Sequence, residues 1–383
     1  MKKILFVIPD FWLAGTNKSL ENLISVLDKN KYEVNVFSLY EDGEDHLKIV
    51  FSPYLVKKST KYHYLHDNYF TRKLYNIYKR IRHQDKSRIC LSEIQKLCDY
   101  YNYDAIIAYS EGTVTEYISC IKTSSKKIAW VHCFYGDKTK AEYNIDRDLP
   151  IYKTYDNVIC VSNEAAKAFQ EQFPSIRERV LSIYNIINVD SIIKASSIPI
   201  IDKRFRNDVF SILSVGHMYG AKRLHMIPGF AKKIIDFDNT IKFKWYVIGA
   251  NTDKRYYDEF CEDIIKYDIK DYVHYLGVKD NPYNYMVNCD LVVCPSTSES
   301  FSYVINEALI LKVPVVSKDF PVAIEMIPEG MGIVSDYDCF PEQIYNLIIN
   351  KSNLYSNIKK TVENHIFTNE LQIKKINELF GIS

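Results

Sequence analysis

The chain has 383 residues, which is enough for two domains that each bury a core of their own. Its 49 Lys and Arg residues nearly balance its 48 Asp and Glu residues, and this balance argues against nucleic acid as a partner. Nine cysteines, an odd number with no C-x-x-C pair, argue against a disulfide framework and against a zinc site.

The N-terminal apolar run is predicted to be a strand and not a targeting signal. Pro9 and Asp10 interrupt it after about five residues, which is too short for the apolar core of a signal peptide. No window of about 18 apolar residues occurs, so no segment is predicted to span a membrane. We therefore expect a cytoplasmic protein.

A strand, a helix and a second strand come first and indicate a parallel sheet. Residues 3–9 and 33–40 are the apolar strands, and Gly15 and Thr16 stand ahead of the helix between them. A glycine there lets an anionic ligand approach the backbone, although it could serve the turn alone. The loop lacks G-x-G-x-x-G, which argues against a dinucleotide-dependent oxidoreductase.

A basic, tyrosine-rich stretch follows over residues 57–88. It places Phe70, Leu74, Ile77 and Ile81 at helical spacing, with Lys and Arg on the other faces. Three interpretations stay open: a solvated surface helix, a docking site for an anionic membrane or a lipid acceptor, and nucleic-acid binding, for which no motif is present.

Three more strands are predicted at 104–109, 127–132 and 157–162. His132 ends the second of them at its carboxyl side, where sites form in open α/β sheets. Its imidazole could hydrogen-bond a sugar hydroxyl, or it could be a packed histidine without a catalytic role.

The alternation of strands and helices predicts an α/β protein of two domains joined by a polar linker. We expect an N-terminal domain over 1–185, a linker over 186–207, a second domain over 208–365 and a C-terminal helix over 366–383.

The second domain is predicted to open with a strand that ends at Gly216, a loop, and a helix at which Lys222 and Arg223 stand. A fixed lysine beside a helix N-terminus can stabilise a departing diphosphate without a metal ion. The next two strands end near Gly249 and Leu276, at the edge of the sheet where open α/β proteins bind their ligands.

Residues 290–317 are the stretch around which the second domain is organised. They indicate a strand, a polar loop, a helix and a second strand over 313–316, with Glu299 and Glu307 on either side of the helix start. The loop amides and the positive end of the helix dipole favour a phosphate at this point. Two carboxylates roughly two helical turns apart could hold the two ends of a sugar nucleotide.

This frame resembles that of the retaining glycosyltransferases of family 4, which have the GT-B fold. The resemblance is carried by Pro295, Ser296, Glu299, Ser300, Phe301 and Glu307. It implies two Rossmann-like parallel-sheet domains with a cleft between them and a C-terminal helix that crosses back to the first domain. It also implies transfer of a sugar from a nucleotide-sugar donor to an acceptor hydroxyl, with the anomeric configuration retained, in the synthesis of surface polysaccharide or glycoconjugates. A glycan or lipid-linked acceptor at the inner face of the membrane would favour the docking interpretation of 57–88.

The resemblance assigns roles to single residues as well. Glu307 would hold the ribose hydroxyls and Glu299 the donor sugar, while Lys222 would stabilise the departing diphosphate and His132 would lie near the sugar. The other expected donor contacts are Arg223, His217 and Gly216, the amides of Ser300, Phe301 and Ser302, the loop at Gly15 and Thr16, and the backbone at Leu276 and Gly249. No metal or other cofactor is expected, because the two D-x-D sequences at 236–238 and 336–338 are predicted to lie in solvated turns.

One departure from the family pattern keeps other functions open. His217 stands where the family usually has an arginine after the glycine. Two alternatives therefore remain: a non-catalytic partner subunit of the same fold, and a nucleotide-sugar epimerase.

Overall fold

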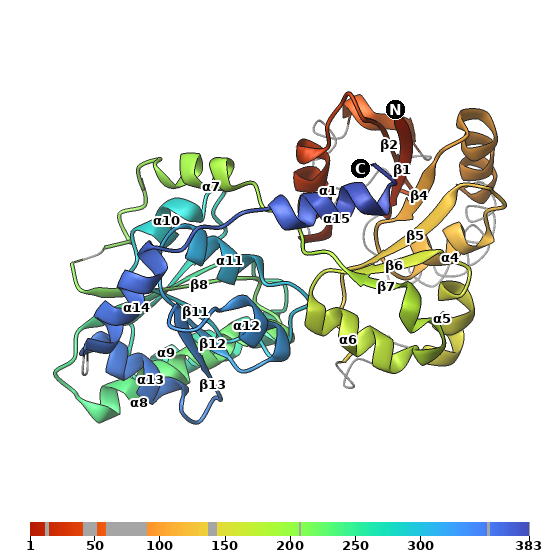
Figure 1. Ribbon diagram of the computed structural model, residues 1–383. Coiled ribbons are helices and arrows are strands. Elements are labelled where there is room, and N and C mark those ends of the chain that lie inside the picture. Colours follow the sequence, from red (N-terminus) through yellow and green to blue (C-terminus); the bar gives the residue numbers. More distant parts are fainter. Residues whose placement is uncertain are drawn as a thin grey trace. The chain divides into compact units, whose positions relative to one another are not determined.

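The computed structural model describes residues 1–11, 15–40, 52–58, 90–136, 144–206, 208–350 and 353–382. The chain forms two compact units. Unit 1 consists of Met1–Ile187 together with Asn369–Ser383, and unit 2 consists of Asn188–Thr368. Figure 1 shows the two units in the colours of the sequence.

Unit 1 is built on a parallel sheet of seven strands in the order β3-β2-β1-β4-β5-β6-β7. Residues 4–8 of β1 are buried throughout, as expected for a central strand that is covered on both faces. The strands are β1 (Lys2–Ile8), β2 (Tyr32–Ser38), β3 (Leu55–Lys58), β4 (Ala105–Ala108), β5 (Lys126–Val131), β6 (Asn157–Cys160) and β7 (Val180–Ser182).

Helices connect these strands and pack their apolar sides on the sheet. Helix α1, for example, buries Leu20, Leu23 and Ile24, which recur at helical spacing. The helices are α1 (Gly15–Val26), α4 (Thr113–Cys120), α5 (Ile145–Tyr152), α6 (Asn163–Gln172) and α15 (Glu370–Leu379), with 3-10 turns η1 (Ser52–Tyr54) and η2 (Pro174–Arg179) and a helical segment over 90–101.

Unit 2 has a parallel sheet of six strands in the order β10-β9-β8-β11-β12-β13. Its strands are β8 (Phe210–Val215), β9 (Phe243–Ile248), β10 (Val273–Gly277), β11 (Leu291–Cys294), β12 (Val315–Lys318) and β13 (Gly332–Ser335). Its helices are α7 (Val189–Ser196), α8 (Ile227–Phe237), α9 (Lys254–Lys266), α10 (Tyr283–Val287), α11 (Tyr303–Ile310), α12 (Pro321–Met326), α13 (Phe340–Ile348) and α14 (Leu354–Glu363), with 3-10 turns η3 (Gly220–Lys222) and η4 (Leu224–Met226).

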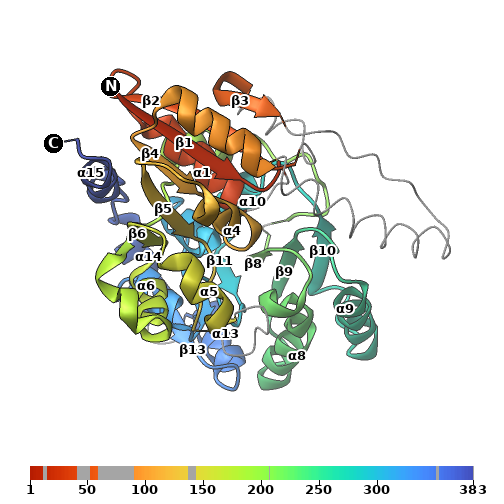
Figure 2. The same cartoon turned by 90° about the vertical axis from the view of Figure 1, so that its right-hand side faces the viewer.

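The helices of unit 2 cover both faces of its sheet. Helix α8 packs against α9 and α13, whereas α11 packs against α10 and α12. In Figure 1 the first group lies on one side of the strands, and α10 and α11 lie on the other. Figure 2 shows α8 and α9 again beside β9 and β10. This arrangement is the doubly wound α/β architecture, and the predicted α/β class is confirmed.

The chain returns to unit 1 through its last helix. The Tyr32 hydroxyl of β2 donates to Asn377 Oδ1 at 2.7 Å, and Lys126 Nζ of β5 donates to the Leu379 carbonyl at 3.0 Å. Phe380, which directly follows the helix, packs edge-on against Tyr32 with 5.8 Å between the ring centroids. Helix α15 is therefore a component of the unit 1 fold.

Two expectations about elements need correction. The strand predicted at 313–316 begins two residues later as β12, because Lys312 has a left-handed backbone with φ of 63° and the chain must first leave that turn. The segment predicted as a linker contains helix α7, whose N-cap Asn188 accepts a hydrogen bond from the Ser191 N–H. Of the basic stretch 57–88, only residues 57 and 58 are described, at the end of β3, and the predicted helix lies outside the described residues.

Candidate active site

The loops that follow β8 and β11 frame the candidate site of unit 2. These two strands are neighbours, whereas β9 lies on the outer side of β8 and β12 on the outer side of β11. The connections therefore leave this point in opposite directions at the carboxyl ends of the strands, which is where open α/β sheets bind ligands. The Thr297 N–H donates to the Ala221 carbonyl at 2.9 Å and ties the two loops together.

Lys222 and Glu299 meet across the two loops. Lys222 Nζ lies 2.5 Å from Glu299 Oε1, and the two side chains are 22% and 14% exposed. The Ser296 hydroxyl donates to the same carboxylate oxygen at 2.8 Å. Burial alone would lower the pKa of Lys222, but the Glu299 carboxylate outweighs it and the net pKa of Lys222 is raised. The lysine is therefore a fixed positive charge at the switch point of the sheet.

Arg223 follows directly, in a backbone conformation that the sequence did not suggest. Its φ is 54°, in the left-handed region, and it separates η3 from η4. Its Nε is buried and, among the described residues, has no hydrogen-bond partner. Helix α8 begins only at Ile227, so the expectation that Lys222 and Arg223 stand at this helix is wrong. A buried guanidinium nitrogen without a partner indicates a place for an anionic ligand.

His217 lies at the start of the same loop, after Gly216, and is exposed. Although the residue is exposed, the atoms around its ring remove part of the solvent, and this desolvation lowers the pKa of His217. The charge of Lys222 lowers the pKa further. The imidazole is therefore neutral near neutral pH, and it can donate one hydrogen bond without adding positive charge.

Gly249 is required by the close approach of two loops. A Cβ on this residue would lie 1.7 Å from the Gly216 carbonyl oxygen, so only glycine fits. The Gly216 N–H donates to the Ile248 carbonyl at 2.9 Å, and the Gly249 N–H donates to the Gly277 carbonyl at 3.1 Å. The ends of β8, β9 and β10 are thus held as one rim.

Leu276 lies on this rim near the end of β10. Its side chain is buried, and its carbonyl accepts a hydrogen bond from Arg204 Nη2 at 3.0 Å. Arg204 is itself held by Asp202 in a two-point ion pair, with 2.6 Å between Nη2 and Oδ2. The backbone at Leu276 is therefore fixed by a residue from the segment that precedes β8.

The loop after β11 leads into helix α11. Ser302 is the N-cap of this helix but its side chain makes no capping hydrogen bond, while Phe301 and Ser302 are buried and Ser300 is partly exposed. Glu307 lies within α11, and the Tyr283 hydroxyl donates to its Oε1 at 3.0 Å. The amides of the first helical turn and the carboxylate of Glu307 therefore belong to one element.

The remaining predicted residues belong to unit 1. Gly15 is the first residue of α1 and Thr16 the second, so the expectation that they stand ahead of this helix is wrong. His132 follows β5, with its ring 4.8 Å from that of Tyr109, and burial lowers its pKa to about 3. Its imidazole is neutral at physiological pH, which fits both a packed histidine and a hydrogen bond to a hydroxyl.

The sequence did not indicate the contacts of three unit 2 residues that lie next to the predicted ones. Ser296 was recognised only as part of the frame, although its hydroxyl positions Glu299. The Ser298 hydroxyl is buried with no partner in the described part of the chain. Tyr283 contacts Glu307 from a helix 24 positions earlier, and no spacing rule in the sequence could have shown this.

Both halves of the chain match known families. Residues 13–191 match Glycosyltransferase Family 4, and residues 200–364 match the glycosyl transferases of group 1. The chain belongs to the group 1 glycosyltransferases. The predicted glycosyltransferase family is therefore confirmed, whereas the retaining mode stays a prediction.

Relatives of this glycosyltransferase are distant in sequence. It is 24% identical over 328 residues to an uncharacterized glycosyltransferase of Methanocaldococcus jannaschii, covering 82% of this chain and 73% of that protein. Among solved structures it resembles Anabaena HepE in complex with UDP and glucose, with a TM-score of 0.77, 16% identity and all of both chains covered. It also resembles sucrose-phosphate synthase of Thermosynechococcus elongatus, with a TM-score of 0.72, 16% identity, and 99% of this chain and 98% of that chain covered. These similarities confirm the GT-B fold.

Neither a membrane-spanning helix nor a metal-binding group is found among the described residues. None of the described helices of the glycosyltransferase is long and apolar enough to cross a membrane. Within the same residues, no group of three or more His, Cys, Asp or Glu side chains is arranged to hold a metal ion.

Proposed function

We propose that this glycosyltransferase transfers a sugar from a nucleoside diphosphate sugar to an acceptor hydroxyl, with retention of the anomeric configuration and without a metal ion. The observation that carries the proposal is the pair of adjacent cations, Lys222 and Arg223, in the loop after β8 of unit 2. There the fixed Lys222 ammonium adjoins Arg223, whose buried Nε has no partner in the described chain. A diphosphate that departs with its negative charge needs such donors in place before the reaction.

The two glutamates suit the two ends of the donor. Glu307 projects from α11 and its Oε1 accepts from Tyr283, and we assign it to the ribose hydroxyls. Glu299 uses Oε1 for both Lys222 and Ser296, and we assign its remaining acceptor sites to hydroxyls of the donor sugar. The amides of Ser300, Phe301 and Ser302 lie between them at the start of α11 and suit the diphosphate.

The proposed reaction needs no side-chain base. The acceptor oxygen forms a bond to the anomeric carbon on the face from which the diphosphate oxygen departs. The acceptor proton passes to an oxygen of the departing diphosphate, so charge and atoms balance. Lys222 and Arg223 stabilise the negative charge that develops on that diphosphate, and the two cations together take the part that a metal ion plays in other transferases. The roles given to Gly15, Thr16 and His132 of unit 1 stay predictions from the family resemblance.

A uridine diphosphate sugar is the first donor to test. Anabaena HepE, which has the same fold, was crystallised with UDP-glucose. In this chain the base would meet the rim at Gly249 and Leu276, where the contacts are made by backbone.

A hexose donor and a glycan or lipid-linked acceptor of surface polysaccharide synthesis complete the proposal. Its support is the basic, aromatic composition of 57–88, which suits the anionic cytoplasmic face of a membrane. Charge removal at Arg72, Lys73, Lys79 and Arg80 should reduce cosedimentation with anionic vesicles. Unchanged cosedimentation would contradict membrane docking by residues 57–88.

The test is nucleotide binding followed by turnover. Thermal shift with UDP, GDP, ADP and UDP-glucose should find one base that stabilises the protein. Lys222→Ala and Glu307→Ala should then each lower the release of nucleoside diphosphate from the matching donor by roughly a hundredfold or more, because charged contacts to the leaving group and ribose are lost. Lys233→Ala, an exposed lysine on α8, is the matched control and should keep full activity.

A second variant separates chemistry from stability. Lys222→Ala leaves Glu299 buried without its cation, which costs roughly 3 kcal/mol of stability. The double variant Lys222→Met with Glu299→Leu removes both charges, so it should regain most of that stability and yet stay inactive. Full activity in Lys222→Ala and Glu307→Ala would disprove the proposal. Donor binding without turnover would instead identify a partner subunit, and conversion of donor without acceptor an epimerase.

A further inference from the structure

The segment ahead of β8 is bonded by its side chains to the loop that follows β10. Arg204 Nη2 donates to the Leu276 carbonyl at 3.0 Å, and Lys279 Nζ donates to Asp202 Oδ2 at 2.8 Å. Both bonds lie within unit 2, and they join residues 72 and 77 positions apart in the chain. We refer to Asp202, Arg204 and Lys279 as the clasp.

Asp202 is the centre of the clasp. Its Oδ1 accepts the backbone N–H and the Nε of Arg204, each at 3.0 Å, and its Oδ2 accepts Arg204 Nη2 at 2.6 Å as well as Lys279 Nζ. The hydrogen bond from the Arg204 side chain lowers the pKa of Asp202 most, and Lys279 lowers it further. The side chains of Asp202 and Lys279 are only 15% and 18% exposed. One ionised carboxylate, partly shielded from solvent, therefore holds two cations.

The segment ahead of β8 is itself anchored on the sheet. The ring of Phe205 lies 4.7 Å from that of Tyr246 on β9 and 5.3 Å from that of Tyr285 on α10, measured between centroids. The Tyr246 hydroxyl accepts the Arg206 N–H and donates to the Arg206 carbonyl, both at 2.9 Å. The clasp is therefore attached to a fixed part of the unit.

Leu276 lies at an irregular point of β10 and is held from outside the sheet. This strand is at one end of the strand order, and its register with β9 shifts between Tyr275 and Gly277. Leu276 is thus the extra residue of a bulge, and Arg204 bonds its carbonyl. Gly277 follows with φ of 74°, and beyond its chain neighbours no described heavy atom lies within 4 Å of a Cβ added there. A flat ligand can therefore approach this backbone closely.

The same loop leads to the glutamate that we assign to the ribose. Asn281 Oδ1 accepts the Tyr283 N–H at 3.1 Å, and Asn281 Nδ2 donates to the Ala195 carbonyl at 2.8 Å. The Tyr283 hydroxyl in turn donates to Glu307 Oε1. Residues 276–283 therefore connect the rim of the site with Glu307, and the clasp holds the first half of this connection.

We propose that Asp202 is a positioning residue for the nucleobase of the donor. Through Arg204 and Lys279 it fixes the backbone of residues 276–279, against which the base binds. The proposal deepens the proposed function, on which the presence of a nucleotide at this rim rests. The clasp accordingly governs the affinity for a nucleoside diphosphate and not the affinity for a diphosphate that lacks the nucleoside.

Two kinds of ligand separate these affinities in the whole protein. UDP, GDP and ADP are titrated by isothermal calorimetry, and inorganic pyrophosphate serves as a diphosphate without ribose or base. Asp202→Asn and Arg204→Gln should each weaken the nucleoside diphosphate that the wild type prefers by roughly tenfold, as expected when a charged hydrogen bond is lost. Pyrophosphate affinity should change by less than about twofold, because Lys222 and Arg223 are untouched.

Turnover gives a second readout that a merely structural role would not produce. In Asp202→Asn and Arg204→Gln the donor KM should rise roughly tenfold while kcat stays within about twofold of the wild type, because only binding of the nucleoside is impaired. Lys279→Met keeps the Arg204 bond to Leu276 and should have a smaller effect. A thermal melt of each variant verifies that it is folded.

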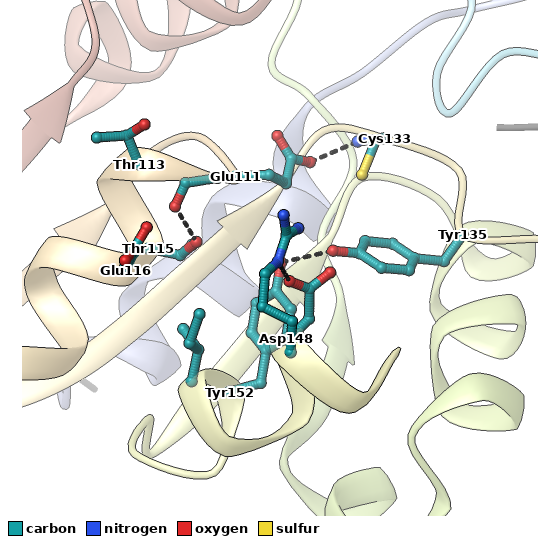
Figure 3. Close-up of a pocket in the computed structure, with 11 residues that line it drawn as sticks. Glu111, Thr113, Thr115, Glu116, Cys133, Tyr135, Asp148 and Tyr152 are labelled. Atoms are coloured by element: carbon teal, nitrogen blue, oxygen red, sulfur yellow. Dashed lines mark hydrogen bonds and ion pairs between the residues drawn. The ribbon is translucent and has the colours of Figure 1, made fainter. Parts of the chain in front are cut away.

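Two controls match these variants. Arg255 forms the same two-point pair with Asp253, with 2.7 Å between Nη2 and Oδ2, but its side chain is 83% exposed on α9. Arg255→Gln should therefore leave both affinities unchanged. Glu116 is an exposed acid of unit 1 that lines a cavity at the carboxyl ends of β4 and β5 (Figure 3). Glu116→Gln removes one acid, as Asp202→Asn does, and should also leave both affinities unchanged.

The outcomes separate the positioning role from the proposed function. Unchanged nucleoside diphosphate affinity in Asp202→Asn and Arg204→Gln, an equal loss of pyrophosphate affinity, an equal loss in Arg255→Gln, or a fall in kcat as large as the rise in KM would each overturn the positioning role. Nucleotide binding by the wild type would still support the proposed function in these cases. A wild type that binds none of UDP, GDP and ADP would overturn the proposed function and with it the role of the clasp.

Discussion

At the scale of single residues, three of the predicted charges of the site are held in place by partners that the sequence does not show. Lys222 is fixed by Glu299, Glu299 by Ser296, and Glu307 by Tyr283. Electrostatic stabilisation of a transition state depends on donors that need not reorganise during the reaction. In the proposed reaction, the short ion pair of Lys222 is therefore the feature of the site that keeps a donor fixed for the departing diphosphate.

His132 gives a prediction about pH at this scale. Its pKa is about 3 in the folded protein and about 6.5 in an unfolded chain, so between these values the unfolded chain binds more protons. Stability from the neutral imidazole is thus fully present above about pH 6.5 and is lost as the pH falls towards 3, by up to about 1.4 kcal/mol per pH unit.

Urea unfolding between about pH 7 and pH 4.5 checks this prediction. In His132→Gln the free energy of unfolding should fall less steeply with acidification than in the wild type. Parallel slopes for the two proteins would show that His132 is not buried as a neutral ring.

At the scale of elements, the rim formed by the ends of β8, β9 and β10 determines how close a ligand can come. Gly249→Ala places a Cβ against the Gly216 carbonyl and must push these two loops apart. We expect the variant to lose at least tenfold in nucleoside diphosphate affinity by isothermal titration, because the amides of the rim move.

Gly229→Ala is the matched control for that variant. Gly229 lies within α8, and no heavy atom lies within 4 Å of an added Cβ. Alanine in a helix interior should stabilise by roughly 0.5–1 kcal/mol and leave nucleotide affinity unchanged. An equal loss of affinity in both variants would contradict the role given to the rim.

The strands were predictable from the sequence, whereas the side-chain partners were not. Continuous apolar runs marked β1, β4, β5, β6, β8, β9 and β11 to within one or two residues, since buried parallel strands leave no other pattern. The helix at Lys222 and Arg223 was predicted wrongly because the left-handed backbone of Arg223 has no sequence signature.

At the scale of the whole molecule, the last helix is structurally part of the first unit. Ile376 is 1% exposed within α15, whereas Leu371 of the same helix is 59% exposed. Ile376→Ala should destabilise unit 1 by about 2–4 kcal/mol, and Leu371→Ala should change stability by no more than about 0.5 kcal/mol.

Limited proteolysis with mass spectrometry distinguishes the two units in this experiment. In Ile376→Ala, cleavage should become faster in 1–187 and stay unchanged in 188–368. Faster cleavage confined to unit 2 would contradict the assignment of α15 to unit 1.

The return of the chain to unit 1 also sets an order for biosynthesis. Unit 2 is one uninterrupted segment, so all of its strands have been translated before Asn369 is added. Unit 1, in contrast, is built from two segments, because residues 1–187 precede unit 2 along the chain and α15 follows it. The sheet of unit 1 is therefore translated well before α15, and until α15 is made the surface of Tyr32 and Lys126 that receives the helix is open to chaperones.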